Sequence, residues 1–174
     1  MRFVKAFLMG VSGLFIIVTL FSLLIPSRVQ VVRTVLINST TSSKVAGQLN
    51  EFNQWKNWHP IFTVDSAVIS ETDNAAVYKI LHRGKELFIT KQFSDSAAVK
   101  FLLQSKGENE LSNEIHFITL PAQDVVQVSW VATTHLHWYP WEKFYAIFID
   151  KLTGSGYEQA LNGLKNYLEK YPSK

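Results

Sequence analysis

The chain has 174 residues, of which 47% are hydrophobic and 18% charged, and it contains no cysteine. This composition excludes a disordered acidic chain and a collagen-like repeat, and the lack of cysteine excludes disulfides, thiolate metal ligands and a cysteine nucleophile. The formal charge is +3, but Arg2 and Lys5 precede an apolar stretch, and without them 15 basic residues stand against 14 acidic ones. Such a nearly neutral remainder argues against a nucleic-acid partner.

An uncharged stretch near the N-terminus has the length and composition of a membrane-spanning helix. The 22 residues between Lys5 and Arg28 carry no charge, and 15 of the 20 residues from Ala6 to Ile25 are apolar. At about 1.5 Å per residue, a helix of this length crosses a hydrocarbon core of about 30 Å. A cleaved signal peptide is the alternative, but its apolar run is usually about 7 to 15 residues and ends in a small-x-small site. The sequence therefore predicts an uncleaved single-pass anchor over residues 1–26.

Basic residues on the two sides of this stretch predict its orientation. Arg2 and Lys5 favour a cytoplasmic N-terminus, which sends residues 27–174 to the extracytoplasmic side, whereas Arg28 and Arg33 weaken that bias. About 148 residues follow the anchor, without a linker rich in Pro, Gly or Ser and without an internal repeat. We therefore expect a membrane protein with one further domain.

This domain is predicted to begin with a strand and a short helix and to continue as a series of strands. Residues 28–36 alternate loosely and are rich in β-branched side chains, and Val45, Leu49 and Phe52 follow with helical spacing. From Phe62 to Leu136, six runs with strand character are separated by turn signals about ten residues apart. This spacing predicts an antiparallel meander.

The last strand of the series separates by chemistry into two faces. Because a strand presents alternate residues to opposite sides, the apolar set is expected to face the interior: Val126, Val128, Trp130, Ala132, Thr134, Leu136 and Trp138. The polar set contains His135 and His137, which could begin a metal site. No third ligand has a suitable spacing to them, so we expect two solvated histidines and no metal.

After Pro140 the pattern changes to a helical period. Phe144, Tyr145, Phe148 and Leu152 share one face until Thr153-Gly154-Ser155-Gly156 interrupts the pattern. A long apolar stripe then follows on a C-terminal helix: Tyr157, Ala160, Leu161, Leu164, Leu168 and Tyr171. Because such a helix needs a sheet to cover, the predicted class is α+β.

Three segments of the chain match motifs of a known superfamily. Val31 to Asn38 (VVRTVLIN) is similar to V-x-R-S-I-x-I-x-A-P, and Leu49 to Pro60 (LNEFNQWKNWHP) is similar to l-x-d-f-x-x-W-x-x-W-x-P. Phe148 to Glu169 (FIDKLTGSGYEQALNGLKNYLE) is similar to K-x-x-G-x-x-f-x-x-G-L-x-x-L-K. The chain thus resembles the SRPBCC superfamily (START/Bet v 1-like, polyketide cyclase/dehydrase), in particular its bacterial membrane-anchored members. It departs from the pattern at Ser39-Thr40, usually Ala-Pro, and at Ala160, usually Gly.

The resemblance implies a helix-grip fold, in which a curved seven-stranded antiparallel sheet wraps around the long C-terminal helix. It also implies a cavity that in many relatives holds a lipid, sterol, polyketide or other apolar molecule. The expected partner is therefore a hydrophobic small molecule, and no cofactor is expected. The residues expected to contact this ligand are Trp130, Trp138, Tyr78, Phe101, Trp141 and Tyr145.

No catalytic residue is predicted. The chain contains no G-x-S-x-G, H-E-x-x-H, G-x-G-x-x-G or P-loop motif. Catalytic relatives use polar residues of the cavity, for which Tyr78, His82, His116 and Tyr145 are available here, but none of them matches a subfamily motif.

Two aromatic clusters have both a structural and a functional interpretation. Trp55 and Trp58, followed by His59-Pro60, favour a helix-to-strand junction fixed to the core over a cavity mouth in which His59 polarises a ligand. The cluster from Trp138 to Tyr145 fits a core edge, a pocket rim or a membrane-interface belt.

Three functions follow as hypotheses. The first is membrane-tethered binding of an apolar or amphipathic small molecule, lipid-like or a hydrophobic metabolite, without converting it. The second is a cyclase/dehydrase-type enzyme that uses the same cavity, and the third is an interaction module whose cavity is filled by its own side chains. A buried polar side chain with a perturbed pKa would favour the enzyme, and an open cavity of a few hundred Å³ would argue against the filled module.

Overall fold

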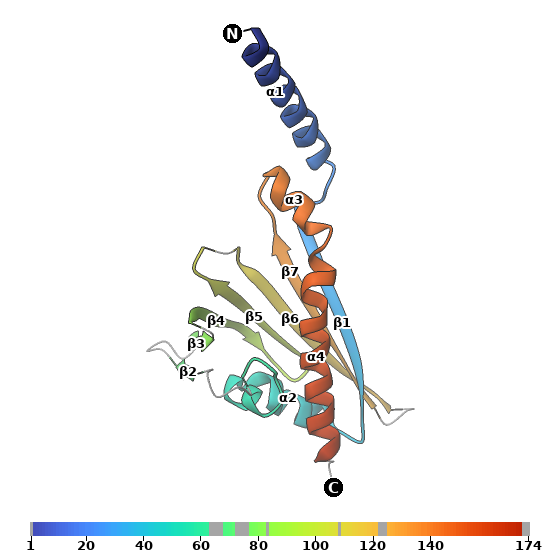
Figure 1. The fold of residues 1–174 in the computed structure, drawn as a ribbon. Helices are drawn as coiled ribbons and strands as arrows, with labels where there is room; N and C mark the ends of the chain where they lie inside the picture. Colours follow the sequence, from blue (N-terminus) through green and yellow to red (C-terminus); the bar gives the residue numbers. More distant parts are fainter. Residues whose placement is uncertain are drawn as a thin grey trace.

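The computed structural model describes residues 2–62, 68–71, 77–82, 84–107, 109–121 and 125–171. The N-terminal helix α1 (Arg2–Ser22) extends away from a domain built of one sheet and the remaining helices (Figure 1). Ser22 is the buried residue of α1, and the apolar side chains of this helix contact little protein. Within the described ranges, α1 is the one helix long and apolar enough to cross a membrane.

The sheet has seven antiparallel strands in the order β1-β7-β6-β5-β4-β3-β2. Their bounds are β1 (Arg28–Asn38), β2 (Val68–Glu71), β3 (Val77–His82), β4 (Lys85–Ser94), β5 (Ala98–Ser105), β6 (Leu111–Leu120) and β7 (Val125–His135). Strands β2 to β6 each pair with the next strand in the chain, which confirms the predicted six-strand meander from β2 to β7. The first strand closes the topology by pairing with β7 along its whole length.

Four helical segments complete the domain. The helix α2 (Ser42–Asn50) and the 3-10 helix η1 (Phe52–Asn57) follow β1, α3 (Pro140–Ala146) follows β7, and α4 (Ile149–Lys170) ends the described chain. The long helix α4 packs against β1 and lies across one face of the curved sheet, with α2 at one end of the domain and α3 at the other (Figure 1). Its buried residues Ala160, Leu161, Leu164 and Leu168 belong to the predicted stripe. The predicted helix-grip fold is thereby confirmed.

The start of α4 differs from the prediction. The helix runs unbroken through Gly154 and Gly156, and the junction between α3 and α4 lies at residues 147–148 instead. Gly154 is buried against the guanidinium of Arg33, and a side chain at this position would collide with that group. Arg33 is itself held by a salt bridge of 2.9 Å to Asp150, one turn earlier in α4. The glycine therefore permits a close approach of β1 to the helix and does not end it.

The interior face of β7 is shorter than predicted. Val126, Val128, Trp130 and Ala132 are buried as expected. The strand ends at His135, so the alternation does not continue to the residues beyond it, and Trp138 is 60% exposed. The prediction that Trp138 faces the interior was therefore wrong, because the chain turns toward α3 before that residue is reached.

Two glycines of α4 provide a test of how tightly η1 packs on this helix. A Cβ atom at Gly163 would collide with the backbone carbonyl oxygen of Trp58, whereas a Cβ at Gly156 would meet open space. We expect Gly163→Ala to lower the free energy of unfolding by about 1 to 3 kcal/mol, because the backbone of the junction must move. Gly156→Ala is the matched control and should raise it by up to about 1 kcal/mol, since alanine favours the helix. Denaturant unfolding of the full chain in one detergent measures both, and equal effects would contradict the close packing.

Candidate functional site

Two adjoining pockets lie between the sheet and α4. The larger has a volume of about 270 Å³ and the smaller about 160 Å³. Four residues line both pockets: Leu87, Leu103, Thr153 and Tyr157. The pockets are therefore two parts of one cleft, whose combined size falls within the range of small-molecule sites, about 300 to 1,000 Å³.

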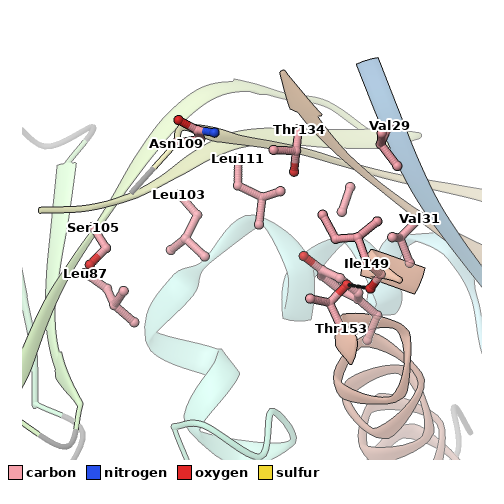
Figure 2. Close-up of a pocket in the computed structure, with 12 residues that line it drawn as sticks. Val29, Val31, Leu87, Leu103, Ser105, Asn109, Leu111, Thr134, Ile149 and Thr153 are labelled. Atoms are coloured by element: carbon pink, nitrogen blue, oxygen red, sulfur yellow. Dashed lines mark hydrogen bonds between the residues drawn. The ribbon is translucent and has the colours of Figure 1, made fainter. Parts of the chain in front are cut away.

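The smaller pocket lies toward the end of the domain that carries α3. In Figure 2, Val29 of β1 and Thr134 of β7 lie on one side of the space, opposite Ile149 and Thr153 at the start of α4, and Val31 of β1 lies beside Ile149. The Thr153 hydroxyl donates a hydrogen bond of 2.8 Å to the Ile149 carbonyl, so it is already satisfied within the helix. Small and aliphatic side chains from the sheet leave the space open here.

The larger pocket is lined by aromatic side chains. Trp55 of η1, Phe101 of β5 and Trp130 of β7 contribute to its wall. The indole of Trp130, which is 3% exposed, donates a hydrogen bond of 3.0 Å to the side-chain carbonyl of the buried Asn113. The indole N–H of Trp130 and the side-chain carbonyl of Asn113 thus satisfy each other. The wall of the larger pocket therefore presents mainly apolar surface.

His59 brings an imidazole to the larger pocket. Its ring is 7% exposed, stacks on Trp55 with centroids 5.3 Å apart, and is buried enough to lower its pKa from 6.5 to about 3. The neutral ring accepts a hydrogen bond of 3.3 Å at Nδ1 from the Ile61 backbone N–H, so its own proton lies on Nε2. No described residue bonds to Nε2, which leaves one N–H donor at the pocket wall.

Tyr157 brings a hydroxyl to both pockets. Burial raises its pKa to about 12, so the phenol stays protonated and neutral. Its ring packs on Trp130 with centroids 5.2 Å apart, and its hydroxyl has no hydrogen-bond partner among the residues that the structure describes. The hydroxyl can therefore donate to or accept from a bound molecule.

The described lining of the two pockets contains no Asp, Glu, Lys or Arg. Among all residues that the structure describes, no group of three or more His, Asp or Glu side chains could hold a metal ion. His135 and His137 are both exposed, and His137 pairs with Glu142 at 3.1 Å. The cleft thus suits an uncharged, mainly apolar molecule with one or two polar atoms, since a buried charge would lack a partner.

The six residues predicted to contact a ligand fall into three groups. Trp130 and Phe101 line the larger pocket. Tyr78 is buried in the core, where its ring packs edge-on against Phe52 at 5.0 Å. Trp138, Trp141 and Tyr145 are 60%, 63% and 51% exposed and lie outside both pockets, on α3 and the segment before it.

Other residues singled out in the sequence are also placed. Trp55 and Trp58 are 1% and 4% exposed, as their structural interpretation requires, although Trp55 also lines the larger pocket. His116 lies on the surface, 3.1 Å from Glu114, while the side chain of His82 lies outside the described part of the structure. The sequence placed Tyr157 in the apolar stripe of the helix but did not predict that its hydroxyl lines a pocket. Helical periodicity predicts which side of a helix faces the sheet, but it does not predict where the packing between them leaves a space.

Comparison with known proteins supports the fold. No protein-family model and no curated protein matches the sequence. Among solved structures, a START superfamily protein from Mycobacterium smegmatis has a TM-score of 0.60 at 12% identity, over 82% of this chain and 98% of that chain. A protein of unknown function from Staphylococcus aureus has a TM-score of 0.62 at 13% identity, over 82% and 96% of the two chains. A hypothetical protein from Helicobacter pylori has a TM-score of 0.57 at 14% identity, over 79% and 86%.

These likenesses establish a START-like fold, as the sequence motifs predicted. The curved sheet and the long C-terminal helix that lies across it agree with the helix-grip fold that the sequence predicted.

The buried imidazole predicts a pH dependence of stability. Above pH 6.5, His59 is neutral in both the folded and the unfolded chain, so it contributes no pH dependence there. Between pH 6.5 and about 3, His59 binds a proton in the unfolded chain but stays neutral in the folded chain. The free energy of unfolding therefore falls as the pH falls, by about 1.4 kcal/mol per pH unit from this group.

Unfolding titrations of the full chain across this range should show a shallower slope for His59→Gln than for the natural protein. His116→Gln, at an exposed position, should keep the natural slope. Identical slopes for all three proteins would show that His59 is accessible to protons in the folded state.

Proposed function

We propose that the protein is a membrane-tethered binding domain that holds an apolar or amphipathic small molecule, lipid-like or a hydrophobic metabolite, between the sheet and α4. The observation that carries the proposal is the uncharged cleft of about 270 and 160 Å³, with its apolar walls. Burial of each methylene of a ligand against such walls is favourable by about 0.8 kcal/mol. A ligand with a long or fused hydrocarbon part gains most from this environment.

Two polar groups support an amphipathic ligand over a pure hydrocarbon. The Nε2–H of His59 can donate to a ligand oxygen, and the hydroxyl of Tyr157 can donate or accept. Both sit in the wall of the larger pocket, which is mainly apolar, so each would fix the orientation of a bound carbonyl or hydroxyl group.

An enzyme of the cyclase/dehydrase type is the second candidate, because two polar side chains of the cleft have displaced pKa values. Proton transfer is most efficient when the pKa of the catalytic group lies near the working pH. The pKa of His59 is lowered to about 3 and that of Tyr157 raised to about 12, so at neutral pH the first is a weak base and the second a weak acid. These directions favour fixed hydrogen-bonding groups, and hence binding over conversion. The open space argues likewise against an interaction module with a filled core.

Residues 1–26 form the proposed anchor and residues 27–174 the binding domain. The 21-residue helix α1 supports the anchor, because it is long and apolar enough to cross a membrane. A tether keeps the cleft close to a bilayer, where apolar molecules are concentrated. Arg2 and Lys5 at the start of α1 favour a cytoplasmic N-terminus and an extracytoplasmic domain.

A reporter fused to the C-terminus tests this orientation. In a bacterial host, alkaline phosphatase folds to its active form only outside the cytoplasm, so the fusion is expected to be active in the membrane fraction. Arg2→Glu/Lys5→Glu, which removes the N-terminal positive charges, should lower that activity. If the alkaline phosphatase fusion is inactive, and a fusion to a fluorescent protein that matures only in the cytoplasm is fluorescent, the proposed orientation is reversed.

Identification of co-purifying molecules tests the binding function. The full chain is purified in lipid nanodiscs, extracted with organic solvent and analysed by mass spectrometry. Thr153→Phe places a ring where both pockets meet, and Ser155→Phe places the same ring on an exposed position of the same helix. We expect a discrete molecule of a few hundred daltons with the natural chain and with Ser155→Phe, depleted at least about tenfold in Thr153→Phe. Equal recovery from all three proteins would contradict ligand binding in the cleft.

A further inference from the structure

An apolar face of the α3 region is turned away from the domain. Its members are spaced as one side of a helix and are between 38% and 63% exposed: Trp141, Phe144, Tyr145, Phe148 and Leu152. The opposite side of the same segment is buried and contains Pro140, Lys143, Ala146 and Ile149. These five exposed residues are called the α3 face below. Large apolar patches that are exposed on a protein surface mark sites of contact with another protein or with a membrane.

The position of α3 relative to α1 indicates what covers this face. Lys143 is 3% exposed, and its ammonium group donates hydrogen bonds of 3.0 Å to the Ile25 carbonyl and 2.6 Å to the Ser27 hydroxyl. Ile25 lies three residues beyond the end of α1 at Ser22. Figure 1 shows α3 at the end of the domain nearest α1. The buried lysine thus fixes α3 to the chain at the point where it leaves the apolar helix.

The apolar surface of α1 continues to this junction. Phe21 and Leu24 are 61% and 79% exposed, and Trp138, on the segment that leads into α3, is 60% exposed. Tryptophan and tyrosine are the residues that collect at membrane–water interfaces, where the ring is in an apolar layer and the polar atom meets the headgroups. The α3 face carries one of each, Trp141 and Tyr145, within two turns of the fixed lysine.

We propose that the α3 face lies in the interfacial layer of the same bilayer that α1 spans. The inference rests on the proposed anchor, because α1 brings the face to the lipid surface. The smaller pocket is bordered by Ile149 and Thr153 at the start of α4, and by Val29 and Thr134 near the ends of β1 and β7. This end of the cleft is therefore held against the membrane, where an apolar molecule can pass between lipid and protein with little exposure to water.

Tryptophan fluorescence provides the test, because the five tryptophans separate by location. Trp138 and Trp141 are on the α3 side, Trp55, Trp58 and Trp130 are at most 4% exposed in the core, and α1 contains none. The full chain is reconstituted into phosphatidylcholine vesicles whose acyl chains are brominated near the headgroup, and flotation of the vesicles confirms insertion. We expect bromine to quench part of the emission, and the quenched fraction to fall at least about threefold in Trp138→Phe/Trp141→Phe.

A reporter at the far end of the domain is the matched control. Ile118 is 52% exposed on β6 and pairs with Gln127, close to the β6–β7 turn and far from His135. Ile118→Trp in the double-variant background therefore adds an exposed tryptophan that lipid should not quench. Quenching of this control to the extent of the natural protein would overturn the proposal.

The remaining outcomes separate this inference from the anchor. If the chain does not float with the vesicles, the anchor is wrong and the interfacial position fails with it. If the chain floats but Trp138 and Trp141 are not quenched, the anchor stands and the interfacial position is overturned. An emission that shifts with protein density in the absence of quenching would assign the face to a second copy of the chain.

Discussion

The packing of Trp55 fixes η1 against the sheet beside the larger pocket. Its ring, 1% exposed, has six aromatic neighbours with centroids 4.9 to 5.9 Å away: Phe52, Trp58, His59, Phe62, Phe101 and Trp130. The indole N–H donates to the Leu49 carbonyl at 3.2 Å, so the tryptophan is also fixed to the end of α2. Large rings thereby occupy the space between the sheet and η1 at this end of the domain.

The same rings leave a gap farther along the sheet. On β7 the interior side chains decrease in size from Trp130 to Ala132 and Thr134 toward the α3 end. Trp130 packs on Tyr157 of α4 with ring centroids 5.2 Å apart, so two large rings separate the sheet from the helix here and leave a gap beside the small side chains farther along β7. The cleft is therefore a consequence of the order of side-chain sizes along the strands, and the glycine contact between Gly154 and Arg33 brings β1 and α4 together beside it.

Exclusion of charge from the cleft determines the chemistry it can hold. Arg33 and Asp150 neutralise each other at 2.9 Å, and the ammonium of Lys143 is taken up by a carbonyl and a hydroxyl near α1. The polar side chains that line the described cleft are all neutral, and they include the Nε2–H of His59 and the hydroxyl of Tyr157. A carboxylate or ammonium ligand would lose its hydration with no opposite charge to replace it, whereas a carbonyl or hydroxyl needs only one hydrogen bond. The rings around His59 exclude water from its imidazole, and this desolvation lowers the pKa of His59 and keeps the ring neutral.

The fold was predictable because its signals are local periodicities. The alternation from Val126 to Ala132 identified the interior face of β7, and the spacing of Ala160, Leu161, Leu164 and Leu168 identified the buried stripe of α4. The site was not predictable in the same way. Tyr157 belongs to the same stripe as Leu164, but one side chain borders a gap and the other is fully buried, a difference set by residues on distant strands. The helix through Gly154 was missed for a related reason, since its partner Arg33 lies on β1.

The α3 segment shows most clearly where periodicity stops being informative. An apolar stripe at helical spacing has the same pattern whether the helix packs on protein or on lipid, so the sequence from Trp138 to Tyr145 left a core edge, a pocket rim and a membrane belt all open. The polar residue supports the proposed membrane belt, because in a surface helix of a soluble domain a lysine is expected to point outward. Here Lys143 is buried and hydrogen-bonded to the end of the apolar N-terminal segment, while the aromatic side chains point away from the domain. An inverted arrangement of this kind is more stable where the medium outside the helix is itself apolar, which is the condition that the proposed bilayer interface provides.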